Sequence, residues 1–597
     1  MWFRSHEYSS EKRTSLALCP EKQFHFSSGF ELSFDIQLRK ELHNYGYIFR
    51  IIGNDSVAFD LLSNFNGGKR SLVLTYRNNS SIPFESADLS AYRYGEWVPV
   101  VFRLDSRKKE ITVSFMGKEI KSAYHSSALK SFRIFFGYCD FQRFKSTEVP
   151  PMTIKNIRLL DHQKRQIASW ELKKHGFNIS YDDLHDLPAI ACNPVWEVDR
   201  HIIWKKEKAF SAPAHTQVAG NHEEGVVYFA NQQFILKYDL EKNKMDTIFP
   251  AGGNPYKERA NQMIYHPFYN ELWSYDFDKQ TISRYLFDRN LWTNGDKELK
   301  NPLYSQHNSF ISPADSCLYV FGGYGEYRYK NSLLKKGVSG KWTLVNYKGS
   351  ITPRFLASAG LKGKDTLLLL GGYGHPSGKQ ELGPENYYDL YELDLKNFVM
   401  SKRWKLNDIS RDFVHANAMI IDEQTKQAFS LCIDNNKTKS YMILKSFDLS
   451  TGANHEFADT IPCTFDTVNS FCTLYYNKNN NRLYAINLHN DEEKSEIKVY
   501  SLACPPFDPK QIYQSEKDTH LVFGNKYWIA GIIASLLTVC FFIFRNRKNS
   551  RQKRLVISEI KDVNLDRITV NDKIPSSVNF IGRFQVFDKT KADVTSL

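Results

Sequence analysis

The chain holds none of the residue sets whose types and spacing define the common catalytic and metal sites. It has no HExxH, no GxSxG and no phosphate-binding glycine loop, and its carboxylates are too scattered to pair as a general acid and base. Its nine cysteines include no CxxC pair and no Cys/His cluster with zinc spacing. We therefore expect a protein that binds rather than catalyses, without a cofactor or a metal.

Aromatic side chains are unusually frequent in this chain. Tyr, Phe and Trp number 33, 42 and 10 among 597 residues, or 14%, whereas the hydrophobic and charged fractions of 42% and 24% are ordinary for a globular protein. This composition excludes a wholly disordered chain, a collagen and a coiled-coil rod. Aromatic residues favour strands, and their rings are common where carbohydrates or proteins bind. The length predicts about three to five folding units.

The first 172 residues are expected to fold as a β-sandwich. Apolar and polar residues alternate in Phe30–Ile36, Trp97–Leu104 and Ile111–Phe115, and turn signals such as Met116-Gly117-Lys118 separate the strands. In their order, the stretches GFELSFDIQL, GEWVPVVFRLD, VSFMGKEIKS and MTIKNIRLLD resemble concanavalin-like (laminin-G-like) jelly rolls. Such sandwiches bind glycans, bind proteins or only support their neighbours, so the resemblance implies a fold more than a function.

A repeat follows the polar connector at residues 173–195. Six apolar strand cores begin 45, 46, 50, 61 and 55 residues apart: Val226–Phe229, Glu271–Ser274, Cys317–Phe321, Leu367–Leu370, Ala428–Leu431 and Leu483–Ile486. A second strand of the type x-Tyr/Phe-Asp-Leu follows three of them. A tryptophan (Trp292, Trp342 or Trp404) stands further on in three units.

Two of these cores end in a diglycine, Gly322-Gly323 and Gly371-Gly372, and each diglycine is followed by Tyr-Gly. A Cβ atom at such a position would block a close strand approach and a turn. With the tryptophans, the pattern resembles kelch repeats. The resemblance implies a six-bladed propeller over residues 196–504, whose units must stack and close a ring because none can bury its apolar faces alone.

In kelch propellers, the loops after the diglycine and those before the first strand of each blade form one rim. Tyr, Arg and His side chains there can stack on sugars or peptides and hydrogen-bond to them. The resemblance thus nominates eight ligand-binding candidates: Tyr324, Glu326, Tyr327, Arg328, Tyr373, His375, Arg354 and His307. Kelch rings also carry copper radical oxidases, whose Tyr, His and Cys types occur here without a diagnostic spacing. A kelch-type carbohydrate-active enzyme therefore stays an alternative.

An apolar run, Tyr527–Phe544, predicts one transmembrane helix. Its 18 residues carry no charge and would span about 27 Å as a helix. The basic run Arg545–Arg554 follows directly, whereas residues 505–526 are balanced in charge, so the positive-inside rule places residues 545–597 in the cytoplasm and residues 1–526 outside. We expect a single-pass protein of the inner membrane. Because Met1–His6 begins no signal peptide, we expect either a missing upstream signal or a mature start.

The last 53 residues contribute +6 to the net charge of +13. Within them, Ser577–Lys589 alternates like a strand, and a turn and Asp593–Leu597 follow. This ending resembles the opening strands of OmpR-like winged-helix domains, with Gly582 and the core residues Phe584, Val586 and Phe587 in place. The recognition helix of such a domain would lie past Leu597, so no DNA-contacting residue can be named, and DNA is a partner only if the chain continues.

Together these patterns predict an all-β exterior, a jelly-roll sandwich followed by a six-bladed kelch-like propeller, and then a single transmembrane helix. The expected boundaries are 1–172, 173–195, 196–504, 505–526, 527–544 and 545–597. The architecture resembles membrane-bound transcriptional regulators of Bacteroidetes. That resemblance implies a sensor that binds a glycan or a protein outside and, as a homodimer, passes the change to a DNA-binding output. A membrane-anchored glycan- or protein-binding module without output is the other alternative.

Overall fold

A computed structural model describes residues 1–514, apart from residues 67–68, 79, 127, 258–260, 277–280, 294–304, 340 and 408, together with residues 577–579 and 585–587. The structure is all-β, with 55% of its residues in strands and 4% in helices, as the sequence predicts. Residues Met1–Lys517 form one compact unit, and Asp518–Leu597 form a second.

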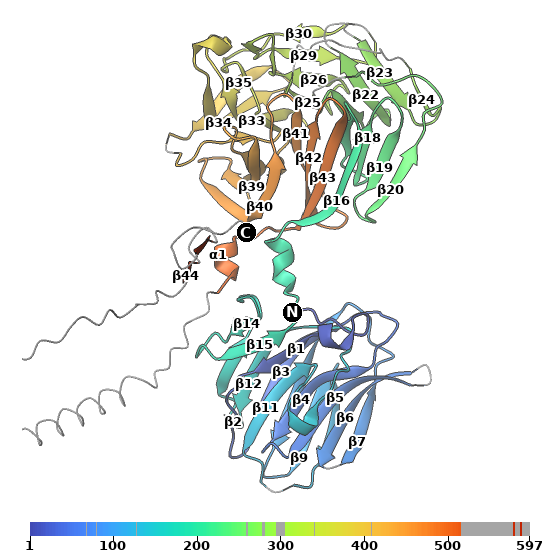
Figure 1. The fold of residues 1–597 in the computed structure, drawn as a ribbon, viewed down its shortest axis with the longest axis vertical. Coiled ribbons are helices and arrows are strands. Elements are labelled where there is room, and N and C mark those ends of the chain that lie inside the picture. Colours follow the sequence, from blue (N-terminus) through green and yellow to red (C-terminus); the bar gives the residue numbers. More distant parts are fainter. Residues whose placement is uncertain are drawn as a thin grey trace, which may run out of the picture. The chain divides into compact units, whose positions relative to one another are not determined.

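The first part of the larger unit is a sandwich of two antiparallel sheets (Figure 1). One sheet has six strands, in the order β10 (Lys118–Ala123), β9 (Glu110–Phe115), β8 (Trp97–Asp105), β3 (Gly29–Leu38), β12 (Met152–Asp161) and β13 (Gln166–Trp170). The other has nine, in the order β14 (Ile179–Tyr181), β15 (Pro188–Cys192), β1 (Ser15–Leu18), β11 (Ser131–Gly137), β4 (Gly46–Gly53), β5 (Val57–Asn66), β6 (Lys69–Asn78) and β7 (Ser80–Asp88), with β2 (Phe24–His25) beside β11.

Alternation along β3 explains how the two sheets meet. Phe30, Leu32, Phe34 and Ile36 are buried, whereas the residues between them are half-buried. The Phe34 ring packs edge-on against Phe136 of the nine-stranded sheet, with centroids 5.0 Å apart. Successive side chains of a strand point to opposite faces, so this pattern places one face of β3 in the core between the two sheets. The predicted strands at 30–36, 97–104 and 111–115 are confirmed.

The connector predicted at residues 173–195 is partly sheet. It contains β14 and β15, and β15 pairs with β1, for example Ala191 with Leu16. These strands are hard to recognise in a polar segment because both are short and β14 lies at the edge of the sheet. The C-terminal part of this segment therefore belongs to the sandwich.

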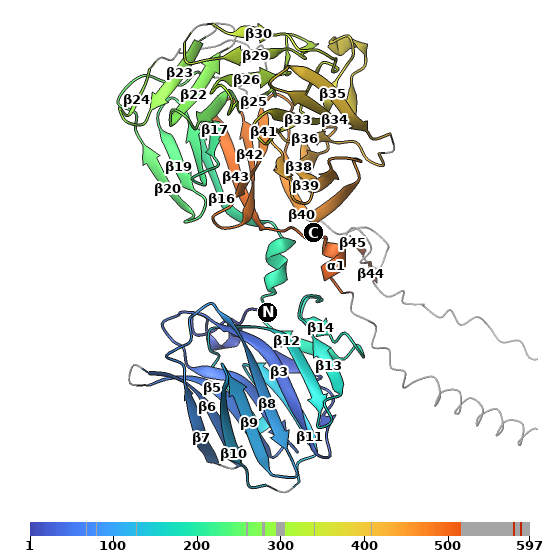
Figure 2. The same ribbon diagram turned by 180° about the vertical axis from the view of Figure 1, so that it is seen from behind.

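Six further antiparallel sheets of four or five strands follow along the described chain, here numbered I to VI (Figures 1 and 2). Sheet I has β17 (Gln217–Asn221), β18 (Val226–Ala230), β19 (Ile235–Asp239) and β20 (Lys244–Ile248); sheet II has β21 (Met263–His266), β22 (Glu271–Asp276), β23 (Thr281–Leu286) and β24 (Leu291–Trp292). Sheet III has β25 (Asn308–Ile311), β26 (Leu318–Phe321), β29 (Leu333–Lys336) and β30 (Thr343–Val345); sheet IV has β31 (Arg354–Phe355), β32 (Ser358–Lys362), β33 (Thr366–Gly374), β34 (Glu385–Asp394) and β35 (Val399–Lys405).

Sheet V has β36 (Val414–His415), β37 (Ile420–Asp422), β38 (Gln427–Ile433), β39 (Lys439–Asp448) and β40 (Asn454–Thr464). Sheet VI has β41 (Ser470–Asn477), β42 (Arg482–Asn490), β43 (Lys494–Ala503) and β16 (Lys205–Pro213). Strand β16 precedes sheet I in the sequence, yet it pairs along its length with β43 of sheet VI. The start of the series is thereby fastened to its end.

Each of these sheets packs face to face against the next. The run Leu367–Leu370 of β33 shows how, because Leu367 and Leu369 join the core with sheet III while Leu368 and Leu370 join the core with sheet V. Sheet VI packs against sheet I in the same way, with Tyr484 and Ile486 against Val227. The six sheets therefore follow one another in a circular order.

The six predicted strand cores are confirmed, since they fall in β18, β22, β26, β33, β38 and β42, with Cys317 directly before β26. The three tryptophans are buried between neighbouring sheets. The diglycines also behave as predicted. Gly371 has a φ of +64°, and a Cβ there would lie 2.4 Å from the His415 ring. The eight cysteines among the described residues are free, and five of them are buried.

The predicted strand Ser577–Lys589 is corrected to a hairpin. Strands β44 (Ser577–Asn579) and β45 (Gln585–Phe587) pair antiparallel, with Val578 opposite Val586. The alternation that we assigned to one strand therefore belongs to two, since a local pattern does not record where a chain reverses. Among the described residues, no helix is long and apolar enough to cross a membrane. The predicted membrane segment, Tyr527–Phe544, lies outside the described residues.

Candidate functional site

A small hairpin after the first diglycine presents the most exposed of the predicted site residues. Strands β27 (Tyr324–Gly325) and β28 (Arg328–Tyr329) pair through the two-residue turn Glu326-Tyr327. Both turn residues have positive φ, +49° and +59°. Such turns normally use Asn and Gly, because a side chain with a Cβ is strained by about 1 kcal/mol or more in the left-handed region. A Glu-Tyr turn is therefore built at a cost in stability.

The same hairpin carries the Tyr327 ring into solvent. This side chain is 75% exposed. Two backbone bonds hold the hairpin against the loop that follows β33: Tyr329 N donates to Gly378 O at 2.8 Å, and Gln380 N donates to Tyr327 O at 3.2 Å. The Tyr324 hydroxyl also donates to the Gln380 side chain. Tyr327 is thus displayed on a backbone that is fixed on both sides.

Four aromatic rings form the base beneath this hairpin. Tyr324 and Tyr329 pack on Phe355, with centroids 5.2 and 5.6 Å away, and Tyr373 packs against Phe355 at 6.0 Å. Tyr324 and Tyr373 are half-buried, and burial raises the pKa of both hydroxyls above the ordinary value. Both phenols therefore stay neutral and can donate and accept hydrogen bonds at physiological pH.

Six of the eight predicted residues lie on this hairpin, at the end of β33 or on the loop that follows it: Tyr324, Glu326, Tyr327, Arg328, Tyr373 and His375. Arg328 forms an isolated bridge with Lys379, which brings the two loops together. The His375 Nδ1 atom lies 2.7 Å from Ser377 Oγ. Glu326 and Arg328 are exposed. The surface therefore offers an anionic, a cationic and a neutral hydrogen-bonding side chain around an exposed ring.

Arg354 does not lie on this surface, which corrects the prediction. Its side chain is 1% exposed and reaches Asp389 at 2.5 Å and 3.3 Å. It also donates to Gly371 O at 2.9 Å and to Thr352 O at 3.0 Å, and its guanidinium lies 4.4 Å from the Tyr387 ring centroid. This residue holds the second diglycine in place.

His307 is also buried, and its Nε2 lies 2.7 Å from the Tyr275 hydroxyl. It belongs to a group of amides that occupies the middle of the six sheets. Asn308 Nδ2 donates to Ala357 O at 2.8 Å, Asn417 Nδ2 donates to His307 O at 2.7 Å, and the Gln306 amide donates to Ser470 O. Sequence reasoning missed these amides, because only Gln306 and Asn308 stand beside His307 and Asn417 lies 110 positions away from it. Ligand contacts are therefore expected on the outer surface.

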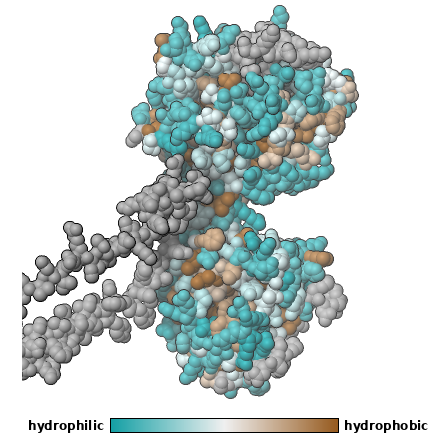
Figure 3. Space-filling view, viewed as in Figure 1, coloured by the Kyte–Doolittle hydropathy of each residue, from teal (hydrophilic) through white to brown (hydrophobic). Residues whose placement is uncertain are grey.

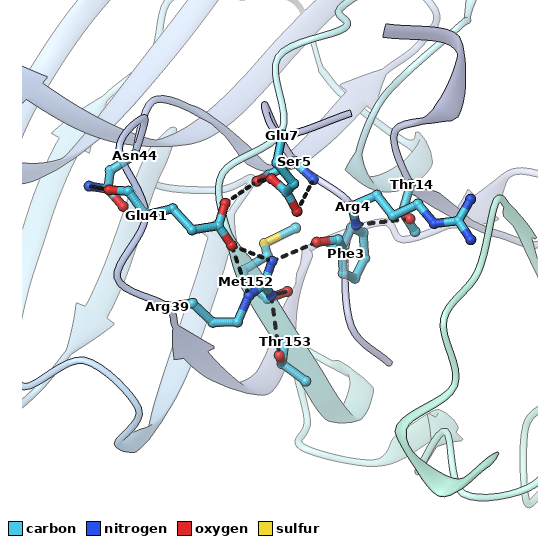
Figure 4. A network of polar contacts seen from close by, with 10 residues as sticks. All are labelled: Phe3, Arg4, Ser5, Glu7, Thr14, Arg39, Glu41, Asn44, Met152 and Thr153. Atoms are coloured by element: carbon cyan, nitrogen blue, oxygen red, sulfur yellow. Dashed lines mark hydrogen bonds and ion pairs between the residues drawn. The ribbon is translucent and has the colours of Figure 1, made fainter. Parts of the chain in front are cut away.

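A cluster of polar side chains that contact one another lies on the sandwich (Figure 4). The Ser5 hydroxyl lies between the carboxylates of Glu7 and Glu41, and Arg39 faces Glu41 at 3.1 Å. One hydroxyl has one proton to donate, so a second proton is needed to satisfy both carboxylates. Burial and the neighbouring Glu7 raise the pKa of Glu41 above its ordinary value. The group ties the N-terminal segment to the turn after β3 and has no apolar platform beside it.

No protein-family model matches the chain, and no curated protein matches it. Solved structures match about a quarter of it. A heptameric pentraxin from Limulus polyphemus is 12% identical over 26% of this chain and 78% of its own, with a TM-score of 0.19. A putative carbohydrate binding protein from Bacteroides ovatus is 10% identical over 30% of this chain and 58% of its own, with a TM-score of 0.22. A toad ovary galectin in complex with thio-digalactose is 11% identical over 24% of this chain and 98% of its own, with a TM-score of 0.18. Similarity at this level does not define a function, which has to be argued from the residues of the chain.

Proposed function

We propose that this chain is a single-pass membrane sensor that binds a glycan on the hairpin Tyr324–Tyr329. In this proposal, sheets I to VI are the blades of a six-bladed, kelch-like propeller. The circular packing of the sheets and the pairing of β16 with β43 support that interpretation. The exterior binds without turning over its ligand.

The exposed Tyr327 ring is the observation that carries the proposal. Leaving most of a tyrosine ring in water forgoes its burial, and placing it at positive φ adds strain. Neither the exposure of the ring nor the positive φ stabilises the fold, so both are expected where the ring binds a ligand. The apolar face of a pyranose ring covers an aromatic ring, while Glu326 and Arg328 can hydrogen-bond to its hydroxyls. In the view of Figure 3 the surface is mainly hydrophilic, with apolar residues in small patches.

A site with one exposed ring and two or three polar groups binds a single sugar weakly. Stacking on an aromatic ring contributes about 1 kcal/mol beyond the area that it buries. Useful affinity then requires two copies that engage one polymeric ligand, and this fits the proposed homodimer. A dimer also provides a route through a single membrane helix, since one helix alone transmits a conformational change poorly.

The membrane and output parts of the proposal depend on sequence. Tyr527–Phe544 and the basic run Arg545–Arg554 are the proposed anchor and its cytoplasmic flank. The pairing of β44 with β45 is compatible with the opening hairpin of an OmpR-like winged-helix domain. We therefore propose DNA as the target of the output.

A glycan array probed with the full chain in detergent micelles tests the binding function. We expect a polysaccharide or oligosaccharide ligand whose signal falls at least tenfold in Tyr327→Ala. Tyr45→Ala is the matched control, because Tyr45 is an exposed tyrosine of the sandwich and should leave the signal unchanged. Equal signals from both variants, or capture of proteins but of no glycan, would contradict the proposed site.

A further inference from the structure

A cavity of about 860 Å³ lies within the larger unit at the place where the chain leaves sheet VI. Three segments line it: Lys173-Lys174 after β13, the short 3-10 helix η3 (Glu197–His201), and Phe507–Gln514, which includes α1 (Pro509–Ile512). This volume lies in the usual range for small-molecule sites. We call it the joint cavity, because it touches both the segment that enters the six sheets and the segment that leaves them.

An ordered group of residues next to the lining joins the segments that form the joint cavity. His175 is buried and stacks on Trp196, with centroids 4.5 Å apart and planes within 10°. Its Nε2 lies 2.9 Å from Asp199 Oδ1. The backbone of His175 also bonds to the leaving segment, since its N donates to Ile512 O at 3.1 Å and its O accepts from Gln514 N at 2.9 Å. The two segments are thus joined like strands behind the cavity.

The lining of the joint cavity is cationic. It includes Lys173, Lys174 and Lys510, against Glu197 as the one carboxylate. Lys173 pairs with Glu171 at 2.8 Å, whereas neither Lys174 nor Lys510 forms an ion pair with any residue that the structure describes. A concave surface with charges of one sign concentrates ligands of the opposite sign.

Aromatic residues complete the lining. Phe507 packs against the His201 ring, with centroids 5.0 Å apart, and Tyr513 is half-exposed at the edge. These rings offer a face to a flat or ring-shaped ligand, and the lysines offer charge to its acidic group. A neutral sugar would leave the lysines without partners. A purely inorganic anion would leave the rings uncovered.

We propose that the joint cavity is a binding site for acidic saccharides, with uronic acids or sulfated sugars as the ligand class. The site is separate from the hairpin Tyr324–Tyr329. Because its ligand would touch both the entering and the leaving segment, occupancy stabilises the pairing of His175 with Ile512 and Gln514. That this change reaches the predicted membrane helix rests on the proposed sensor function.

Calorimetry on the full chain in detergent micelles, with digalacturonate as the probe and neutral digalactose as the comparison, tests this site. We expect digalacturonate to bind, digalactose to bind at least tenfold more weakly, and added salt to weaken the acidic ligand. The double variant Lys174→Gln/Lys510→Gln should lose tenfold or more in affinity. Lys362→Gln/Lys364→Gln removes two exposed lysines of β32 and its turn and should change nothing.

Hydrogen exchange supplies a readout that separates this site from the hairpin site. Digalacturonate should slow exchange of the amides in residues 511–514, and Tyr327→Ala should leave that protection intact. Absence of digalacturonate binding would overturn the proposal. So would equal losses in the two lysine double variants, or binding without protection of residues 511–514. Failure of the glycan array alone would leave these results unaffected.

Discussion

Replacing Arg354 tests whether its buried ion pair is structural. In Arg354→Leu, the Asp389 carboxylate would remain buried without its partner, and Gly371 O and Thr352 O would each lose a donor. Breaking a buried pair in this way costs about 3–5 kcal/mol. Removing both charges in Arg354→Leu/Asp389→Leu should recover a large part of that loss, because no uncompensated charge then remains.

Urea unfolding followed by tryptophan fluorescence measures these effects. Since the sandwich and the six sheets can unfold separately, the transition that shifts must be the one reported by Trp404, which packs between sheets IV and V. An exposed control, Arg328→Leu, should shift no transition by more than about 0.5 kcal/mol. A loss below about 1 kcal/mol in Arg354→Leu, or a double variant that is less stable than the single one, would refute the structural role.

Three further predictions concern the turn, the diglycine and the carboxyl pair. The double variant Glu326→Asn/Tyr327→Gly relieves strain and should raise the unfolding free energy by about 1 kcal/mol while removing glycan binding. A more stable variant that still binds would contradict the role of the turn. Gly371→Ala should destabilise the protein by several kcal/mol in urea titrations, because the added Cβ would lie 2.4 Å from His415. Gly363→Ala is the control, because a Cβ at Gly363 would meet no neighbour. An equal loss of stability in the two variants would contradict the steric role of Gly371. Because the pKa of Glu41 is raised in the folded state, ionisation of this carboxyl group destabilises the fold as the pH rises through its folded-state pKa. Glu41→Gln should therefore raise Tm at pH 7 and give no such gain in acid. A gain in Tm that is independent of pH would contradict the raised pKa of Glu41.

Strand positions could be predicted from the sequence because they depend on local patterns. Alternation marked β3, and the unbroken run Leu367–Leu370 marked a strand buried on both faces. The diglycine at 371–372 was recognisable because only glycine fits its positive φ beside a neighbour.

The remaining features depend on residues that lie far apart. Arg354 was assigned to a surface because its partner Asp389 stands 35 positions away. The amide of Gln306 reaches Ser470, 164 positions on, and no local pattern announces such a contact. The turn at Glu326-Tyr327 was missed for the opposite reason, since its residues are unusual for the backbone that they adopt.

The pairing of β16 with β43 also governs how the protein can be made. The two strands lie about 280 positions apart, so Lys205–Pro213 has no native partner until nearly the whole series of sheets has been synthesised. Until then its backbone groups form an open edge that can capture a strand of another chain. Synthesis therefore includes a long interval in which this one segment needs protection, and a chaperone that holds extended strands should be found there. In a chain that stops before Lys494, β16 has no partner strand and its edge stays open.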